Sequence, residues 1–101
     1  MKIEHGKVWV MIDELDDGIV LTLGGGKSHI GAIATSRGEC VELDDHKEGP
    51  LALKFAKAVS EKLGRPVVCV AGIHYDNATK EDIDQILKDA DALLEELLER
   101  I

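Results

Sequence analysis

The side chains best suited to chemistry follow an apolar, mostly β-branched segment, residues 67–71. The chain changes character at Gly72, and His74, Asp76 and Asn77 come within the next five positions. A buried strand that ends in polar residues often builds a site, because the strand fixes the backbone while the residues past its end face an opening. Such a set could hold an acceptor-rich ligand, and an imidazole could serve as a general base. Asp76 and Asn77 are equally suited to a turn before a helix, where their side chains bond nearby amides.

A glycine-rich segment, residues 24–26, is followed by Lys27 and His29 between two strand-like runs. Three consecutive glycines leave the backbone bare, and bare amides beside a lysine can form a nest for a phosphate or a carboxylate. Glycine is also the default residue of tight connections, so a simple loop between two strands is the alternative. A nucleotide-binding P-loop is excluded, because Leu21 stands where that motif needs its first glycine and residues 30–35 resemble a strand where it needs a helix.

A third polar segment, residues 44–48, places His46 and Lys47 between a strand-like run and a helix. His29, His46 and His74 thus all lie at junctions between elements, and such residues can converge although they are far apart in sequence. No two of them have the i, i+4 spacing of a helical zinc motif, and the chain has no Cys-x-x-Cys. We therefore expect no metal site, and the spacing defines no nucleophile beside a base.

Hydrophobic periodicity predicts an α+β domain with a mainly antiparallel sheet of about five strands and two helices, in the order ββββαβα. Short connections between the first four strands, beginning with the Asp-Gly turn at residues 16–18, favour an antiparallel meander. Pro50 suits the first turn of a helix that Gly64 ends, and Thr79 with Asp82 forms a capping-box pair. The expected strands are residues 7–15, 19–23, 30–35, 40–43 and 67–71, and the expected helices are residues 50–63 and 79–101.

The length and composition of the chain exclude several classes of function. The 101 residues predict one domain, residues 1–101, with a modest core. Aromatic residues make up only 3% and the net charge is −8, which argues against binding to nucleic acid or to an anionic membrane surface. No apolar run approaches the length of a membrane span and the N-terminus lacks a signal-peptide pattern, so we expect a cytoplasmic protein. A broad apolar stripe on the last helix and the edges of the sheet lead us to expect a homodimer.

Three motifs follow one another in a characteristic order and spacing. They are Gly24-Gly25 with His29-Ile30-Gly31-Ala32, then His46-Lys47-Glu48, then Ala71-Gly72-Ile73-His74 with Asp76-Asn77-Ala78. In this order the chain resembles the LpdD-like prenylated-flavin chaperones, small proteins associated with UbiD-type decarboxylases. The resemblance covers about residues 18–98. The chain departs from the family pattern at Ser28, where proline is usual, and at Asp45, where glycine is usual.

The resemblance implies a protein that binds prenylated FMN and helps to deliver it to the decarboxylase, without catalysing a reaction. It also implies a fold similar to that of proteasome assembly chaperones, which is a dimeric α+β architecture. The expected ligand is therefore prenylated FMN or FMN, and the expected partner is a UbiD-type decarboxylase. Together with the glycine nest and its lysine, the resemblance gives the expected cofactor-binding residues Gly24, Gly25, Gly26, Lys27, His29, Gly31, His46, Lys47, Gly72, His74, Asp76 and Asn77.

Two other classes of function stay open at this point. The same fold could serve as a protein-assembly chaperone or interaction module without a small-molecule ligand, and the histidine segments would then be structural. A small enzyme with His29 or His74 as general base is the third class. A polar, glycine-lined set of strand ends favours a small anionic ligand, whereas an exposed apolar patch would favour a protein partner.

Overall fold

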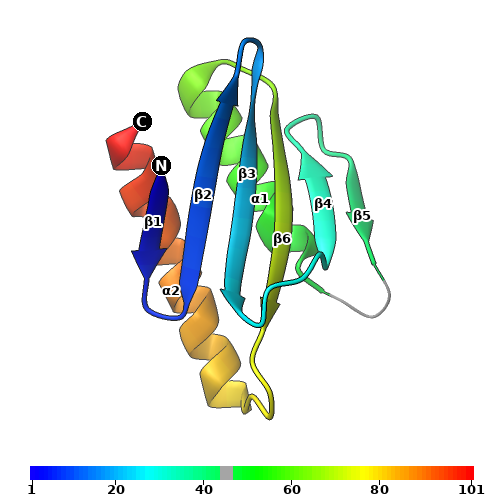
Figure 1. Ribbon diagram of the computed structural model, residues 1–101, viewed down its shortest axis with the longest axis vertical. Coiled ribbons are helices and arrows are strands. Elements are labelled where there is room, and N and C mark those ends of the chain that lie inside the picture. Colours follow the sequence, from blue (N-terminus) through cyan, green and yellow to red (C-terminus); the bar gives the residue numbers. More distant parts are fainter. Residues whose placement is uncertain (44–46) are drawn as a thin grey trace.

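The computed structural model of the protein describes residues 1–43 and 47–101, which contain six strands and two helices (Figure 1). In chain order these are β1 (Lys2–His5), β2 (Val8–Leu15), β3 (Gly18–Gly26), β4 (Ala32–Thr35), β5 (Cys40–Glu42), α1 (Gly49–Leu63), β6 (Val67–His74) and α2 (Lys80–Arg100). The predicted α+β class is confirmed, but β1 was not predicted. This strand has four residues, of which Ile3 alone is buried, so it carries no periodic pattern.

The six strands form one mixed sheet in the order β1-β2-β3-β6-β4-β5. β3 and β6 run parallel, and every other neighbouring pair is antiparallel. The expected meander of the first four strands is therefore wrong, because β6 lies between β3 and β4. The two central strands are also longer than predicted, and their pairing continues until Gly26 lies opposite His74. Pairing on both sides of β3 outweighs the weak strand preference of its glycines.

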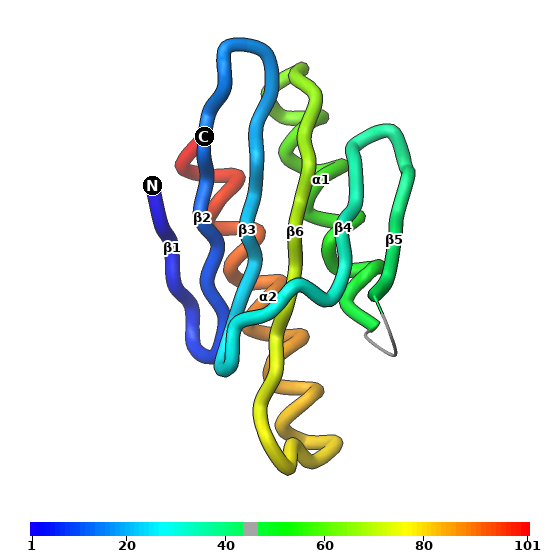
Figure 2. Tube along the Cα trace, turned by 45° about the vertical axis from the view of Figure 1, so that its right-hand side comes forward, coloured from blue at the N-terminus to red at the C-terminus, as the bar shows by residue number. Residues whose placement is uncertain are grey.

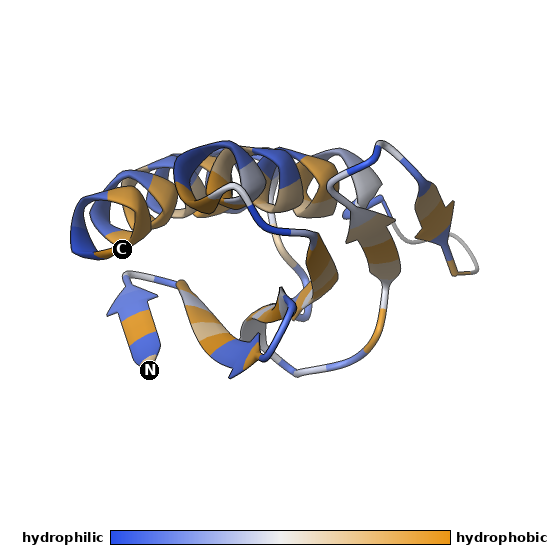
Figure 3. Ribbon diagram, turned by 90° about the horizontal axis from the view of Figure 1, so that it is seen from above, coloured by the Kyte–Doolittle hydropathy of each residue, from blue (hydrophilic) through white to orange (hydrophobic). Residues whose placement is uncertain are grey.

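Both helices pack on one face of the sheet, and no helix covers the other face in the part of the chain that the structure describes (Figure 3). α1 contacts mainly β6 and β4, and α2 contacts β1 and β2. Alternate strand residues point into the space between the two layers, where they meet the apolar faces of the helices. The largest buried side chains of this core include Leu21, Leu23, Phe55, Leu93 and Leu97.

The uncovered side of the sheet, which we call the open face, is partly apolar. Val20, Val68 and Val70 are half-buried there, and Met11 and Ile33 are each 37% exposed. These residues occupy neighbouring positions of adjacent strands, since each alternates with a residue that is buried under the helices. The two-layer architecture therefore leaves apolar strand residues in contact with solvent.

Local signals set the helix ends as predicted. Gly64 ends α1 with a φ of 66°, and its N–H donates to the carbonyl of Ser60 at 2.7 Å. At the start of α2, the Asp82 N–H donates to Thr79 Oγ1 at 3.1 Å and the Thr79 N–H donates to Asp82 Oδ2 at 2.9 Å. This capping box lowers the pKa of the Asp82 carboxyl group, because both hydrogen bonds favour its charged form. Neither helix is long and apolar enough to cross a membrane within the part of the chain that the structure describes.

Candidate functional site

Two glycines in neighbouring strands, Gly24 of β3 and Gly72 of β6, lie opposite each other near the carboxyl ends of these strands. Both are buried. A Cβ atom at Gly24 would collide with the indole ring of Trp9, and a Cβ atom at Gly72 would collide with the carbonyl group of His29. The ring and the carbonyl group therefore lie directly on the strand backbone, where only glycine leaves room for them. The glycine run that was expected to form a loop is the end of a strand.

The connection from β3 to β4, residues 27–31, has to cross β6 because β6 separates the two strands it joins (Figure 2). It is fixed to β6 at both ends of the crossing. The Lys27 N–H donates to the carbonyl of His74 at 2.8 Å, and the Gly31 N–H donates to the carbonyl of Ala71 at 2.8 Å. The Lys27 amide is thus engaged within the protein, so the backbone nest expected around this residue lacks that donor.

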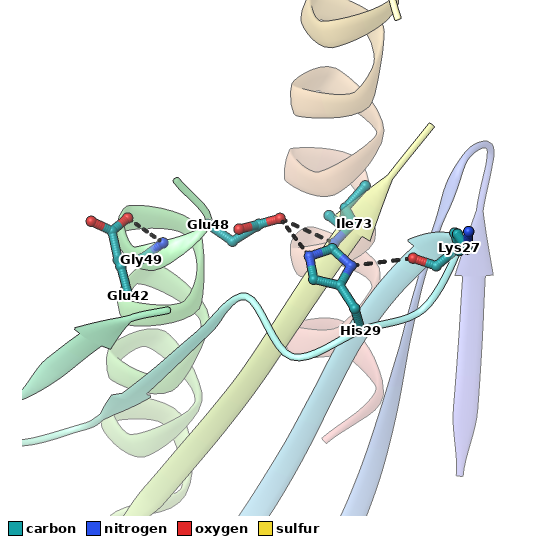
Figure 4. A network of polar contacts seen from close by, with 6 residues as sticks. All are labelled: Lys27, His29, Glu42, Glu48, Gly49 and Ile73. Carbon is teal, nitrogen blue, oxygen red and sulfur yellow. Dashed lines mark hydrogen bonds and ion pairs between the residues drawn. The ribbon is translucent and has the colours of Figure 1, made fainter. Parts of the chain in front are cut away.

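His29 lies in the middle of this crossing and is half-buried. Its Nδ1 atom lies 3.2 Å from the carbonyl oxygen of Lys27, and its Nε2 atom lies 3.4 Å from Oε1 of Glu48 (Figure 4). A carbonyl oxygen can only accept, so Nδ1 is the donor in the first contact. The same Glu48 oxygen accepts a hydrogen bond from the Ile73 N–H at 3.4 Å. Glu48 therefore connects the imidazole ring to the end of β6.

His74, the last residue of β6, brings a second imidazole to the same place. The ring centroids of His29 and His74 are 6.2 Å apart, and the rings meet edge to face at 86°. His74 Nε2 lies 2.9 Å from Oδ1 of Asp76. A recess of about 280 Å³ opens here, and it is lined by Lys27, Ser28, His29 and His74. We call it the histidine recess. It brings together side chains from two segments that are far apart in sequence.

The other predicted site residues in this region lie beside the recess. Asp76 and Asn77 are exposed in the turn after β6, and Asn77 adopts a φ of 57°, which asparagine tolerates well in turns. Gly26 ends β3 with a φ of 64°, and Gly25 packs against the backbone of the β1–β2 turn. At Gly31, a Cβ atom would collide with the carboxylate that orients His29. These glycines thus make room for neighbouring protein groups, and at Gly31 that group is the carboxylate beside His29.

Residues 2–101 match the family described as the prenylated flavin chaperone LpdD-like domain. The chain belongs to this family. None of the curated proteins is similar enough to count as a match. Because the match covers essentially the whole chain, the sheet, both helices and the histidine recess are all parts of the LpdD-like domain.

A second depression of the LpdD-like domain lies on the helix side of the sheet, at the same end of β6. It has a volume of about 200 Å³, and we call it the helix groove; its lining residues are Lys47, Glu48, Leu51, Ile73, Ile83, Ile86 and Leu87. The first turns of α2 project beyond the end of the sheet (Figure 1), and there Ile83 and Leu87 are 49% and 50% exposed. Lys47 thus lines this groove and not the histidine recess. His46 lies outside the described residues.

Two residues around the recess were not among the predicted site residues. Glu48 orients His29, and the available signal was its position directly after His46-Lys47 in the second motif. Trp9 covers Gly24 on the open face, and nothing in the apolar pattern of β2 distinguishes it from an ordinary strand residue.

In the histidine recess, the LpdD-like domain places imidazole rings beside a cationic side chain. Both ring nitrogens of His29 contact protein groups, whereas His74 contacts Asp76 through Nε2 and presents Nδ1 as a donor or acceptor. Lys27 supplies an exposed ammonium group. In residues 1–43 and 47–101, no three His, Cys, Asp or Glu side chains form a group that could hold a metal ion.

Proposed function

We propose that this LpdD-like domain binds a flavin mononucleotide, prenylated or plain, in the histidine recess and carries it without transforming it. The observation that supports this most strongly is the convergence of His29, His74 and Lys27 at one recess of a protein with a net charge of −8. The overall charge repels an anion, so a phosphate site has to be made by local groups. Membership of a prenylated flavin chaperone family supports a flavin as the anionic ligand.

Each group of the recess suits a different part of the ligand. The Lys27 ammonium group can hold the phosphate as a point charge. The Nδ1 atom of His74 can hydrogen-bond to a carbonyl oxygen or ring nitrogen of the isoalloxazine system. The His29 ring, whose two nitrogens contact Lys27 and Glu48, can pack against the same system. Glu48 orients one ring and Asp76 contacts the other, and such support lowers the cost of ordering the site when a ligand binds.

Loss of single side chains tests the recess. Lys27→Ala should weaken flavin binding about ten- to a hundredfold, because a charge-assisted hydrogen bond contributes roughly 1.5–3 kcal/mol. Equilibrium titration followed by flavin absorbance measures this change. Lys62→Ala is the matched control, since Lys62 is an exposed lysine in the last turn of α1. Equal affinities of the two variants would contradict the role of Lys27.

The helix groove supports the second half of the proposal, delivery of the flavin to a UbiD-type decarboxylase in the cytoplasm. The groove offers apolar side chains to a protein partner, and Glu48 belongs to both its lining and the support of His29. A decarboxylase bound there would lie next to the carried ligand. A protein-assembly chaperone without a small-molecule ligand would also need such an apolar groove. Absence of flavin binding would favour that second function.

A charge introduced into the groove separates delivery from binding. Ile83→Asp should abolish activation of the apo-decarboxylase by the loaded protein while flavin affinity stays within about twofold, because buried charge is costly at an interface. Leu15→Asp is the control, since Leu15 is 58% exposed at the opposite end of the sheet. Activation that survives Ile83→Asp would place the partner elsewhere.

We further propose that the protein is a homodimer in which the second copy covers the part of the open face around Val20, Val68 and Ile33, away from Trp9. The eight acidic residues of α2 lie in the helix layer. The apolar residues of the open face form a strip that runs across adjacent strands. A second copy meets less repulsion on the open face than on the helices. Sedimentation should give twice the chain mass for the wild type and a smaller species for Ile33→Asp; a wild-type monomer at micromolar concentration would contradict the dimer.

A further inference from the structure

Trp9 lies flat on the strand next to the histidine recess, although it does not line that recess. Its ring atoms Cε2 and Cη2 would be 2.6 and 2.9 Å from a Cβ atom placed on Gly24. Gly24 lies opposite Gly72, and the carbonyl group of His29 lies on Gly72. The indole ring and the crossing segment therefore occupy neighbouring places on the same open face, each seated on a glycine.

The ring is half-buried, and it already holds a positive charge. The Lys2 ammonium group lies 4.8 Å from the ring centroid, which is the geometry of a cation–π contact. Lys2 is 48% exposed in its side chain and also pairs with Glu4 at 3.3 Å. An exposed contact of this kind is weak, so Lys2 can move aside. A ring face that attracts a cation also attracts an electron-poor aromatic system.

We propose that Trp9 is the stacking platform for the isoalloxazine ring of the flavin whose polar edge His29 and His74 contact. This inference rests on the proposed function. The isoalloxazine ring is a flat, electron-poor heteroaromatic system, and indole is the most electron-rich aromatic side chain. The pair of glycines explains why the indole ring and the crossing segment lie at the same height above the sheet. Gly24 lets the indole ring lie against β3, and Gly72 lets the backbone of His29 lie against β6.

Three substitutions test the platform. Trp9→Leu removes the aromatic face and keeps an apolar side chain, so FMN affinity per folded molecule should fall roughly five- to a hundredfold, the range for loss of one aromatic stack. Trp9→Phe keeps a ring and should lose less. Gly24→Ala keeps Trp9 but forces its ring away, so it should weaken FMN binding as Trp9→Leu does. Leu15→Ala, at an exposed residue at the far end of β2, is the control and should bind as the wild type.

A spectroscopic readout separates stacking from a structural role. Indole stacked on a flavin gives a broad long-wavelength charge-transfer absorbance, and Trp9 is the only tryptophan of the chain. The band should appear when the wild type is saturated with FMN and be absent from Trp9→Phe, which also decides the matter if Trp9→Leu does not fold. If the wild type binds FMN without this band, or if Trp9→Leu binds FMN as tightly as the wild type, the stacking role of Trp9 is wrong while the proposed function stands. A wild type that binds neither FMN nor prenylated FMN would overturn the proposed function and the platform with it.

Discussion

The two ends of the central strands each carry a recess of about 280 Å³, but their polar groups are used differently. At the end formed by the β2–β3 turn and the start of β6, the cationic side chain is hydrogen-bonded to the backbone. Ser36 Oγ accepts the Val67 N–H at 3.0 Å, and Arg65 donates to the carbonyl groups of Leu15 and Gly18. At the other end, His29, His74 and Lys27 line the recess.

The comparison shows that the volume of a recess does not identify a site. Arg65 is a cation like Lys27, but its hydrogen bonds hold the β2–β3 turn against the start of β6. The Lys27 side chain, by contrast, is exposed at the mouth of its recess. A charged side chain that is already hydrogen-bonded to the backbone, like Arg65, stabilises the fold. An exposed one at a recess, like Lys27, is available to a ligand.

Among the substitutions that test this difference between the two recesses, Gly72→Ala should have the largest effect on stability and on flavin affinity. Its Cβ atom would overlap the His29 carbonyl group, so the crossing segment would have to move away from β6. Overpacking of this kind typically costs about 1–3 kcal/mol of unfolding free energy, and the displaced segment should no longer bind flavin. Urea unfolding and flavin titration of the same preparation measure both effects.

The control for that variant is Gly64→Ala, at the other end of the domain. Gly64 has a φ of 66° but no atom within 4 Å of an added Cβ, so only backbone strain of about 1 kcal/mol is expected. Flavin affinity should not change. If Gly72→Ala binds flavin as tightly as Gly64→Ala does, the crossing segment is not part of the site.

His74→Asn should weaken flavin binding about tenfold, because one hydrogen bond to the ligand contributes roughly 1–1.5 kcal/mol. The melting temperature of the unliganded variant should stay near that of the wild type, since His74 is exposed and the partner it contacts, Asp76, is also exposed. Calorimetry and titration test the two parts. A fall in melting temperature with unchanged affinity would mean that His74 only packs.

Arg65→Met should produce the opposite pattern at the other recess. The variant loses the hydrogen bonds to the β2–β3 turn, and because the side chain is 29% exposed we expect a loss of about 1–2 kcal/mol of unfolding free energy. Flavin affinity should stay within about twofold. Weakened binding in a folded Arg65→Met protein would show that the two ends are coupled.

The smallest effect concerns Asp89, which fastens the β1–β2 turn to α2. Its carboxylate accepts the Lys7 N–H at 3.0 Å and the Gln85 amide at 2.8 Å, and these hydrogen bonds lower its pKa from 3.8. The stabilisation is fully present above the pKa of the unfolded state and is lost as the pH falls through the lower pKa of the folded state. Melting temperatures below about pH 4 should therefore fall less steeply in Asp89→Asn than in the wild type. Equal slopes would contradict this role.

Local signals in the sequence predicted the helices well. Thr79 with Asp82 and the terminal Gly64 act within one turn of chain, so their effect does not depend on distant partners. The order of the strands depends on distant partners, and for that reason the insertion of β6 between β3 and β4 could not be predicted. β1 was missed because one buried residue makes no pattern.

The candidate site was predicted in outline only. His29 and His74 were recognised from their positions at junctions, and the fold does bring their rings together. The glycines were misread as a loop because glycine is common in turns, whereas here Gly24 and Gly72 make room for Trp9 and His29. This role depends on which side chain or backbone group of another segment packs on each glycine, and a single sequence does not show those tertiary contacts. The place of Glu48 behind His29 depends in the same way on tertiary structure.

Equilibrium dialysis of the wild type against FMN and prenylated FMN, beside the double variant His29→Ala/His74→Asn, tests the central claim most directly. We expect saturable binding of one flavin per chain by the wild type, and binding at least tenfold weaker by a double variant that remains folded by circular dichroism. Absence of saturable binding of either flavin by the wild type, or equal affinity in the folded double variant, would contradict it.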